Sequence, residues 1–491
     1  MATSPQRASG RSKAFDAIVT QSKTDRKRLD SGALGVFSLT ALGIASVVGA
    51  GIFATTGTAS AEFAGPAVVI SFVLAGIAAA AMAVSYAELA SMIPAAGSTY
   101  SYAYAIFGVF PAWFIGWDLL LEYLFAASTV AVSWSGYAVS FLDHVGLNVP
   151  DSLAGPPFGD DSGVVNLPAM VIVGLTTALL AIGMRQSARA NNSMVVLKMV
   201  VLILFVVVGA TVITASNWDP FVPPAGDHFG DYGVGGILRG AGLVFFAYVG
   251  FDAVSTAAAE SRNPQRTVPI GLLLTVLIST LLYVAIGLVL TGMTSYTNLN
   301  VADPLAKAIE AVGGLGWLRT VVGIGAVVGL ASTVMVTFYG QTRIFMRMSS
   351  DGMLPPAFGH VSKRSRTPVF STILCGLVGG AVAGLLPIDT LAELVSIGTL
   401  LAFVIVCSGV LYLRRTHPDA ERPFRVPHVR LVAGIGIFSA LALMASLPAD
   451  TWIRLGAWLV IGLVIFFTYA RRHTHARMAE VEAGEPSTAG G

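Results

Sequence analysis

Long apolar runs are the feature of this 491-residue chain that most limits its fold. They recur along the whole chain, and about 20 apolar residues in a helix cross the hydrocarbon core of a bilayer. Lipid offers no partners to backbone polar groups, so only helices or closed barrels span it, and these runs are too long for barrel strands. Charged residues make up 11% of the chain, against about 25% in soluble domains. We therefore predict an all-α integral membrane protein and exclude a soluble enzyme, a nucleic-acid binder and a single-span receptor.

Twelve transmembrane helices are predicted from these runs. Each run has about 18 or more mainly apolar residues, the length expected of a membrane-spanning helix. The runs lie near 35–60, 66–92, 108–141, 166–184, 191–215, 234–259, 267–292, 318–348, 369–387, 390–413, 429–447 and 451–470.

The distribution of basic residues predicts the orientation of the chain. Of its 29 Lys and Arg residues, 24 lie in the first tail, in the segments after every second predicted span, or in the last tail. The opposite segments contain only Lys307, Arg319 and Arg454, together with several aspartates. Positive residues favour the cytoplasmic side, so both termini are expected in the cytoplasm of a multi-pass protein of the cell membrane.

Glycines near the middle of two spans predict interrupted helices. The first span contains Gly49 and Gly51, and the sixth contains Gly250, followed by Asp252. Glycine lets the backbone leave helical angles, and broken helices at corresponding places in two halves of a chain indicate a transporter site. The alternative is that these glycines are only packing contacts between helices.

At these residues the chain resembles a known group, the amino acid–polyamine–organocation superfamily, and within it the bacterial branch similar to the cationic amino acid transporters. The motifs of the resemblance are Gly49-Ala50-Gly51-Ile52-Phe53, Glu88 to Pro94 with Ala96-Gly97-Ser98, Phe245 to Ser255, Glu260 to Pro264, Tyr339 to Arg343 and Asp351 to Pro355.

The resemblance implies a LeuT-type fold in which helices 1–5 and 6–10 form inverted repeats and helices 1 and 6 are broken. The expected division of the chain is a cytoplasmic tail (1–34), the first repeat (35–215), the second repeat (216–413), helices 11 and 12 (414–471) and a disordered cytoplasmic tail (472–491).

The resemblance also implies a substrate site between the two broken helices. There the first helix would bind the amino acid's backbone groups, and the sixth would supply carbonyls, an apolar wall and an aromatic gate. Many family members have Thr or Ser at the position of Ala50, so a hydroxyl is missing here. Phe251 resembles the gate, with Asp252 beside it in a gating or structural role. The expected substrate-binding residues are Val47, Val48, Gly49, Ala50, Gly51, Ile52, Phe246, Ala247, Phe251 and Val254.

Lys198 is the sharpest functional candidate. It lies about eight residues into the fifth span, or about 12 Å deep in a core of about 30 Å. An ammonium at that depth is costly and functional by default, although a lysine can also extend toward the interface. In proton-coupled relatives a lysine in this helix takes the place of a coupling sodium. The resemblance implies that Lys198 contacts carbonyls near Gly49, with Ser332 and Thr333 as the rest of the former ion site.

Other charged residues allow two interpretations each. Glu122, deep in the third span, either takes part in the proton route or bonds a neighbouring backbone. Arg239, in the sixth span, either reaches the outer interface or lines an outer vestibule. Four further residues near the predicted cytoplasmic ends of helices are expected to form an inner charge network: Glu88, Arg262, Arg343 and Asp351.

These observations predict a proton-coupled amino acid symporter that works by alternating access. An exchanger or facilitator of the same fold is the alternative, and an ion channel or a membrane enzyme fits the sequence poorly. No cofactor or metal is expected beyond H⁺ as the coupling ion. The expected partners are an amino acid, preferably small or medium and neutral, and membrane lipid, but not nucleic acid. A small membrane subunit and the oligomeric state stay open.

Overall fold

The computed structural model describes residues 35–93, 98–158, 163–183, 188–256, 261, 263–362, 365 and 367–474. The predicted N-terminal tail, the predicted C-terminal tail beyond residue 474, Arg262 and parts of two sequence motifs therefore lie outside the described residues. The described part consists of helices, turns and connecting segments and contains no β-strand. The predicted all-α class is confirmed.

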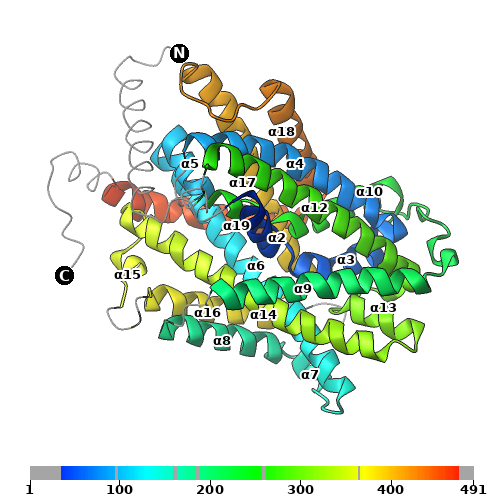
Figure 1. Ribbon diagram of the computed structural model, residues 1–491. Coiled ribbons are helices and arrows are strands. Elements are labelled where there is room, and N and C mark those ends of the chain that lie inside the picture. The colour runs from blue at the N-terminus through cyan, green and yellow to red at the C-terminus, as the bar shows by residue number, and fades with distance from the viewer. Residues whose placement is uncertain are drawn as a thin grey trace.

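The long helices run side by side as a single bundle (Figure 1). Their bounds are α2 Val36–Val47, α4 Val68–Met92, α6 Val109–His144, α8 Leu167–Ile182, α9 Ala188–Gly209, α10 Gly233–Val244, α12 Pro264–Met293, α14 Gly316–Ser350, α16 Val369–Leu385, α17 Ile388–Thr416, α18 Val429–Ser446 and α19 Ala449–Ile465.

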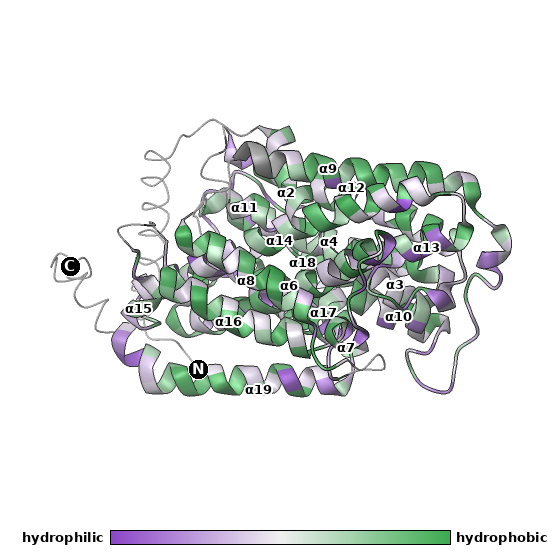
Figure 2. Cartoon of the chain, turned by 90° about the horizontal axis from the view of Figure 1, so that it is seen from below, coloured by the Kyte–Doolittle hydropathy of each residue, from purple (hydrophilic) through white to green (hydrophobic). Residues whose placement is uncertain are grey.

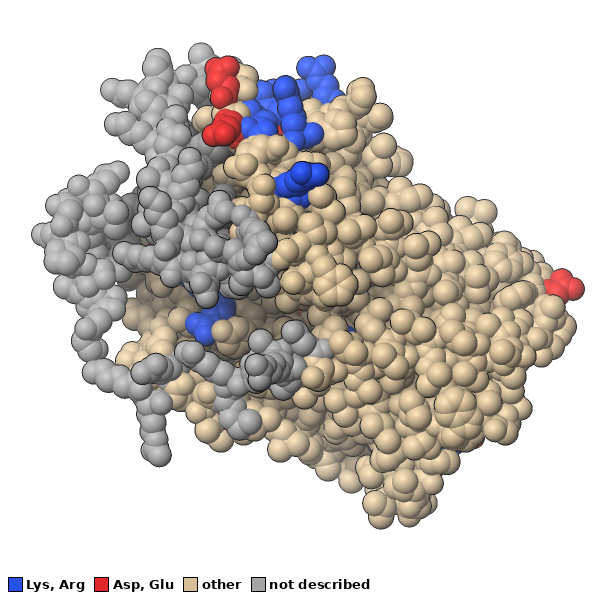
Figure 3. Space-filling view, in the orientation of Figure 1, with Lys and Arg blue, Asp and Glu red and all other residues tan. Residues whose placement is uncertain are grey.

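Each predicted apolar run overlaps one of these helices. Among the described residues, nine helices are long and apolar enough to cross a membrane, and three shorter apolar helices accompany them. Apolar residues cover the long helices, including α19 at the edge of the bundle (Figure 2). Charged side chains gather toward the ends of the molecule, and the middle of the visible face is almost free of them (Figure 3). Such a surface suits lipid rather than water.

Two helices occupy segments between the predicted spans. The helix α5 (Ser98–Phe107) follows α4, and α13 (Pro304–Val312) precedes α14. The Tyr100 hydroxyl of α5 donates to Asp351 Oδ2 at 2.8 Å, which fixes α5 against the end of α14. Both helices are too short and polar to register as membrane spans, so a search for long apolar runs does not find them.

The peripheral helix α19 is attached to α6 by two tryptophans. The Trp117 indole N–H donates to the Trp458 carbonyl at 2.8 Å, and the Trp458 indole N–H donates to the Trp117 carbonyl at 3.0 Å. The two rings stack with centroids 4.7 Å apart. This reciprocal pair joins elements 341 residues apart in the sequence.

Candidate transport site between two broken helices

The first predicted span is broken near its glycines. The helix α2 ends at Val47, and Val48 is extended, with ψ of 96°. Helical structure resumes as a π-helix, η1, over Gly51–Thr55. Gly49 O accepts the amides of Ile52 and Phe53 at 3.1 and 3.2 Å, which begins the new helix. The predicted interruption of this span is present.

The sixth span is broken in the same manner. The helix α10 passes into a 3-10 turn, η6, over Phe245–Tyr248, and Val249 is extended. Gly250 has φ of +104°, a conformation that side-chain-bearing residues rarely adopt. A short helix, α11, follows over Ala253–Thr256.

The two breaks lie directly against each other. A Cβ added to Gly51 would lie 2.4 Å from the Cα of Ala247, a distance that no carbon atoms tolerate. A Cβ on Gly250 would lie 3.1 Å from the carbonyl oxygen of Ser46. Glycine at these positions therefore permits a backbone-to-backbone contact, as well as the helix interruptions. The sequence left open whether these glycines interrupt the helices or only pack against a neighbour, and the structure shows that they do both.

Every residue predicted to bind substrate is buried. The apolar ones from both breaks are 6% exposed or less. Phe251 stacks on Phe403 of α17 with ring centroids 5.0 Å apart, and Tyr86 of α4 meets both rings edge-on. Phe251 thus lies in an aromatic cluster on the α11 side of the break, whereas Phe246 lies on the α10 side. The predicted binding residues are therefore shielded from solvent in this conformation, whereas Val249 and Gly250 at the sixth-span break are partly exposed.

Lys198 connects α9 to the first break. Its ammonium donates to the carbonyl oxygens of Ala45 and Val48 at 2.6 and 2.7 Å, and the residue is 1% exposed. These carbonyls belong to the last turn of α2, where a break leaves oxygens without helical partners. Gly329 of α14 packs against the lysine stem, since a Cβ there would lie 3.1 Å from Lys198 Cβ. Lys198 therefore points inward and does not extend to the interface.

Ser332 and Thr333 lie on α14 beside the same break. Both hydroxyls donate to the Gly329 carbonyl, at 2.8 and 3.0 Å. A Cβ on Gly49 would lie 3.5 Å from the Thr333 methyl group, so Thr333 contacts the broken segment itself. Of the predicted former ion site, Thr333 thus lies against the break, and Ser332 is bonded to Gly329, which packs on the lysine stem.

Tyr283 of α12 is a site residue that the sequence analysis missed. Its hydroxyl lies 2.8 Å from the Ala247 carbonyl and 3.2 Å from the Val47 carbonyl, one at each break. The residue is fully buried. Nothing in the local sequence singles it out, because a tyrosine in an apolar helix is usually interpreted as a residue that only packs against its neighbours.

Glu122 of α6 lies among other acids. It is 5% exposed and within electrostatic range of Asp118, one turn earlier, and of Asp252 at the sixth-span break. Asp118 is 1% exposed, and its oxygens have no hydrogen-bond partner among the described residues. The structure thus brings Glu122 and Asp252 together, as members of an acidic group that also includes Asp118.

Arg239 has a partner that the sequence analysis did not foresee. Its guanidinium pairs with Glu393 of α17 at 2.5 Å, and its side chain is only 11% exposed. The partner lies 154 residues away in the sequence, so no local pattern predicts the pair.

The expected inner charge network also differs. Glu88 pairs with Arg414 at 2.6 Å, whereas Asp351 pairs with Arg347 and Arg343 bonds Tyr339. The three described members therefore have separate partners.

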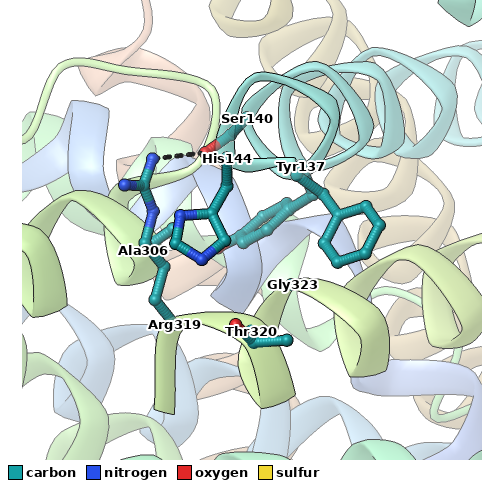
Figure 4. Close-up of a pocket in the computed structure, with 8 residues that line it drawn as sticks. Tyr137, Ser140, His144, Ala306, Arg319, Thr320 and Gly323 are labelled. Atoms are coloured by element: carbon teal, nitrogen blue, oxygen red, sulfur yellow. Dashed lines mark hydrogen bonds between the residues drawn. The ribbon is translucent and has the colours of Figure 1, made fainter. Parts of the chain in front are cut away.

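Two cavities lie away from the breaks. An open groove of about 650 Å³ lies between α6, α17 and α19, with Arg454 and Trp458 among its lining residues. A much smaller cavity lies where the end of α6 meets α13 and α14, with Arg319 bonded to Ser140 at 3.2 Å (Figure 4). Tyr137 lines this small cavity, and its hydroxyl donates to the Phe53 carbonyl at 2.7 Å. The small cavity therefore adjoins the helix that follows the first break.

A bundle of apolar helices around two abutting helix breaks defines a membrane transporter rather than an enzyme. Comparison with known proteins agrees: the family model described as amino acid permease matches residues 34–470. The chain belongs to the amino acid permease family, whose members are multi-pass membrane proteins.

Bacterial and plant proteins are among those similar to this chain. The chain is 42% identical to the methylthioribose transporter of Bacillus subtilis (strain 168), over 94% of this chain and 98% of that protein. It is also 42% identical to the branched-chain amino acid permease BcaP of the same organism, over 90% and 93% of the two chains. The vacuolar cationic amino acid transporter 4 of Arabidopsis thaliana is 36% identical, over 79% of this chain and 64% of that protein. The expected resemblance to cationic amino acid transporters is thereby confirmed.

Proposed function

We propose that this protein takes up a neutral, branched-chain type of amino acid together with protons, by alternating access. The observation that carries the proposal is the contact between Lys198 and the carbonyls of Ala45 and Val48 at the first helix break. The protonated amine binds two carbonyl oxygens at the end of α2 with a full positive charge. Loss of the proton removes that charge and weakens both bonds, so protonation and the conformation of the break depend on each other.

The nature of the substrate follows from the side chains at the two breaks. The predicted binding residues are all glycine or apolar residues, so they offer a wall for an aliphatic side chain and no counter-charge for a cationic one. Backbone groups at the breaks are left for the substrate's carboxylate and ammonium. The likeness to BcaP supports this substrate class.

Methylthioribose is the second candidate substrate. The relative named for it is as similar to this chain as BcaP is, so identity does not separate the two. Methylthioribose has neither a carboxylate nor an ammonium group, and it would have to bind at the breaks through hydroxyl groups. An exchanger of the same fold is the alternative mechanism, and Lys198 argues against it.

The membrane arrangement belongs to the same proposal. Twelve spanning helices with both termini in the cytoplasm place the positively charged segments on the inner side of the cell membrane. Helices 1–5 and 6–10 are then the inverted repeats, each beginning with a broken helix.

Uptake into proteoliposomes tests the proposal. Radiolabelled leucine, isoleucine, valine, arginine and methylthioribose would be offered with and without an inward proton gradient. We expect gradient-driven accumulation of the branched-chain amino acids by the wild type. In Lys198→Met we expect accumulation to disappear, whereas exchange across liposomes loaded with the same amino acid continues.

Lys307→Met is the matched control, because Lys307 lies in α13 with a side chain 46% exposed. It should accumulate substrate like the wild type. Uptake that ignores the proton gradient and requires internal amino acid, in both the wild type and Lys198→Met, would overturn the symport mechanism in favour of exchange. Accumulation of methylthioribose, without accumulation of any amino acid, would refute the proposal that the substrate is a branched-chain amino acid.

A further inference from the structure

One end of α17 is bound to two other helices, α10 and α19, through Glu393. Its Oε1 accepts a hydrogen bond from the Arg239 guanidinium of α10 at 2.5 Å, and its Oε2 accepts one from the Thr451 hydroxyl of α19 at 2.5 Å. Arg239 also reaches toward the Ser446 carbonyl at the end of α18, at 3.5 Å. Its charge lies over the ring of Phe63, 4.9 Å from the centroid.

The Arg239–Glu393 pair therefore joins α17 to segments of both broken spans. Phe63 belongs to the π-helix η2 (Ala59–Ala64), which continues the first broken span, and α10 is the first half of the sixth. Both side chains are nearly buried, 11% and 6% exposed. Separating one of two buried charges from the other is costly, because each would stay in a poorly solvating environment.

The other end of α17 is bound to α4 through Arg414. Its Nε and Nη2 donate to the two carboxylate oxygens of Glu88 at 2.8 and 2.6 Å, a two-pronged pair. The Val426 amide donates to the same carboxylate at 2.8 Å, and Arg422 approaches it at 3.3 Å. Glu88 is 1% exposed, so this pair is as firmly built as the first.

The distance between the two pairs matches the membrane. Glu393 and Arg414 are 21 residues apart on one helix, or about 31 Å at about 1.5 Å per residue. A hydrocarbon core is about 30 Å thick. The helix α17 thus carries an ion-paired acid near one surface and an ion-paired base near the other. In the proposed orientation the first is the outer pair and the second is the inner pair.

We propose that these two pairs are latches that open one at a time, so that α17 closes the site on whichever side its ion pair is intact. Both latches are closed in this structure, and the predicted binding residues between them are buried. Outward opening separates α10 from α17 and breaks the outer pair, while the inner pair holds. Inward opening separates α4 from α17 and breaks the inner pair. This inference rests on the proposed alternating-access function.

Site-specific thiol labelling tests the latches. Cys407 of α17 is fully buried, two turns from Arg414, and reports the inner end. Ser396→Cys introduces a second reporter at a fully buried position one turn from Glu393. Each reporter is used alone, with the native cysteines otherwise replaced by serine, in liposomes without substrate or proton gradient. An impermeant maleimide is added to the outer or the inner face.

We expect Glu393→Gln to increase labelling of the outer reporter several-fold and to decrease labelling of the inner reporter. Arg414→Gln should do the reverse. Thr451→Val removes one contact from Glu393, and Arg422→Gln removes one contact from Glu88, but both keep the main ion pair. Thr451→Val should therefore change labelling in the same direction as Glu393→Gln, and Arg422→Gln in the same direction as Arg414→Gln, each by a smaller factor. Arg319→Gln is the control, because Arg319 is a predicted outer cation whose described contacts leave α17 untouched.

Equal changes at both reporters in each variant, or unchanged labelling with only a lower melting temperature, would show that the pairs are structural and overturn the inference. If Glu393→Gln and Arg414→Gln do not fold, the labelling of Thr451→Val and Arg422→Gln is judged by the same criterion. Because no substrate or gradient is used, the result does not depend on which molecule is transported or on proton coupling. Failure of the latches and failure of the proposed symport are therefore distinguishable.

Discussion

Replacement of Gly51 by alanine tests the central contact between the two broken helices. A Cβ at this position would lie 2.4 Å from the Ala247 Cα, about 1 Å short of ordinary contact, and the obstacle is backbone that cannot rotate away. Alanine gains about 0.5–1 kcal/mol of helix preference over glycine. Overpacking of this kind costs about 1–3 kcal/mol. The net effect is destabilising, and the two breaks must move apart by about 1 Å.

We expect Gly51→Ala to lower the melting temperature in detergent and to reduce initial uptake in proteoliposomes by up to about 60-fold, which corresponds to a net cost of up to about 2.5 kcal/mol. Gly434→Ala, on α18, is the matched control, because a Cβ there meets nothing within 4 Å. It should keep full uptake and melt at the same or a slightly higher temperature. Wild-type uptake and melting in Gly51→Ala would refute the close contact of the breaks.

Three further predictions follow from the described contacts. Tyr283→Phe leaves the buried carbonyl of Ala247 without its hydroxyl donor, and an unpaired buried group of this kind costs about 1–3 kcal/mol. Substrate affinity, measured by equilibrium binding, should therefore fall. An unchanged affinity would show that this hydrogen bond does not shape the site. Burial raises the pKa of Asp303, in the segment before α13, to about 6, so the folded state prefers the protonated acid. The difference in melting temperature between the wild type and Asp303→Asn should therefore fall as pH rises from about 4 to about 6, and should stay constant above about pH 6. The control is Asp450→Asn, at an exposed position. A difference that does not depend on pH, or the same trend in the control, would contradict this prediction. Trp458→Phe keeps a ring but loses the indole bond to α6, so the melting temperature should drop while substrate affinity stays the same, and a loss of affinity instead would place the pair within the transport site.

Much of the fold could be predicted because lipid leaves little choice. In lipid a run of apolar residues forms a helix because its backbone has no other hydrogen-bond partners, and each predicted run overlaps one of the helices described. The helices α5 and α13 escaped prediction because they are short and carry polar residues, so they lack the one pattern that the search used.

The site was predictable only in part. The glycines of the two breaks and the lone Lys198 stand out in sequence because each is costly in a membrane helix unless it has a purpose. Tyr283 and the Arg239–Glu393 pair do not stand out. Their importance depends on which distant carbonyl or carboxylate they meet, and spacing along one helix carries no information about that.

The reciprocal tryptophan bonds between α6 and α19 have a consequence for biogenesis. A ribosome makes α6 long before α19. Until α19 arrives, the Trp117 indole N–H lacks the Trp458 carbonyl that it bonds in the folded protein, whereas the Trp117 carbonyl keeps its bond within α6. Packing of α6 is therefore completed only after the rest of the described bundle has been made.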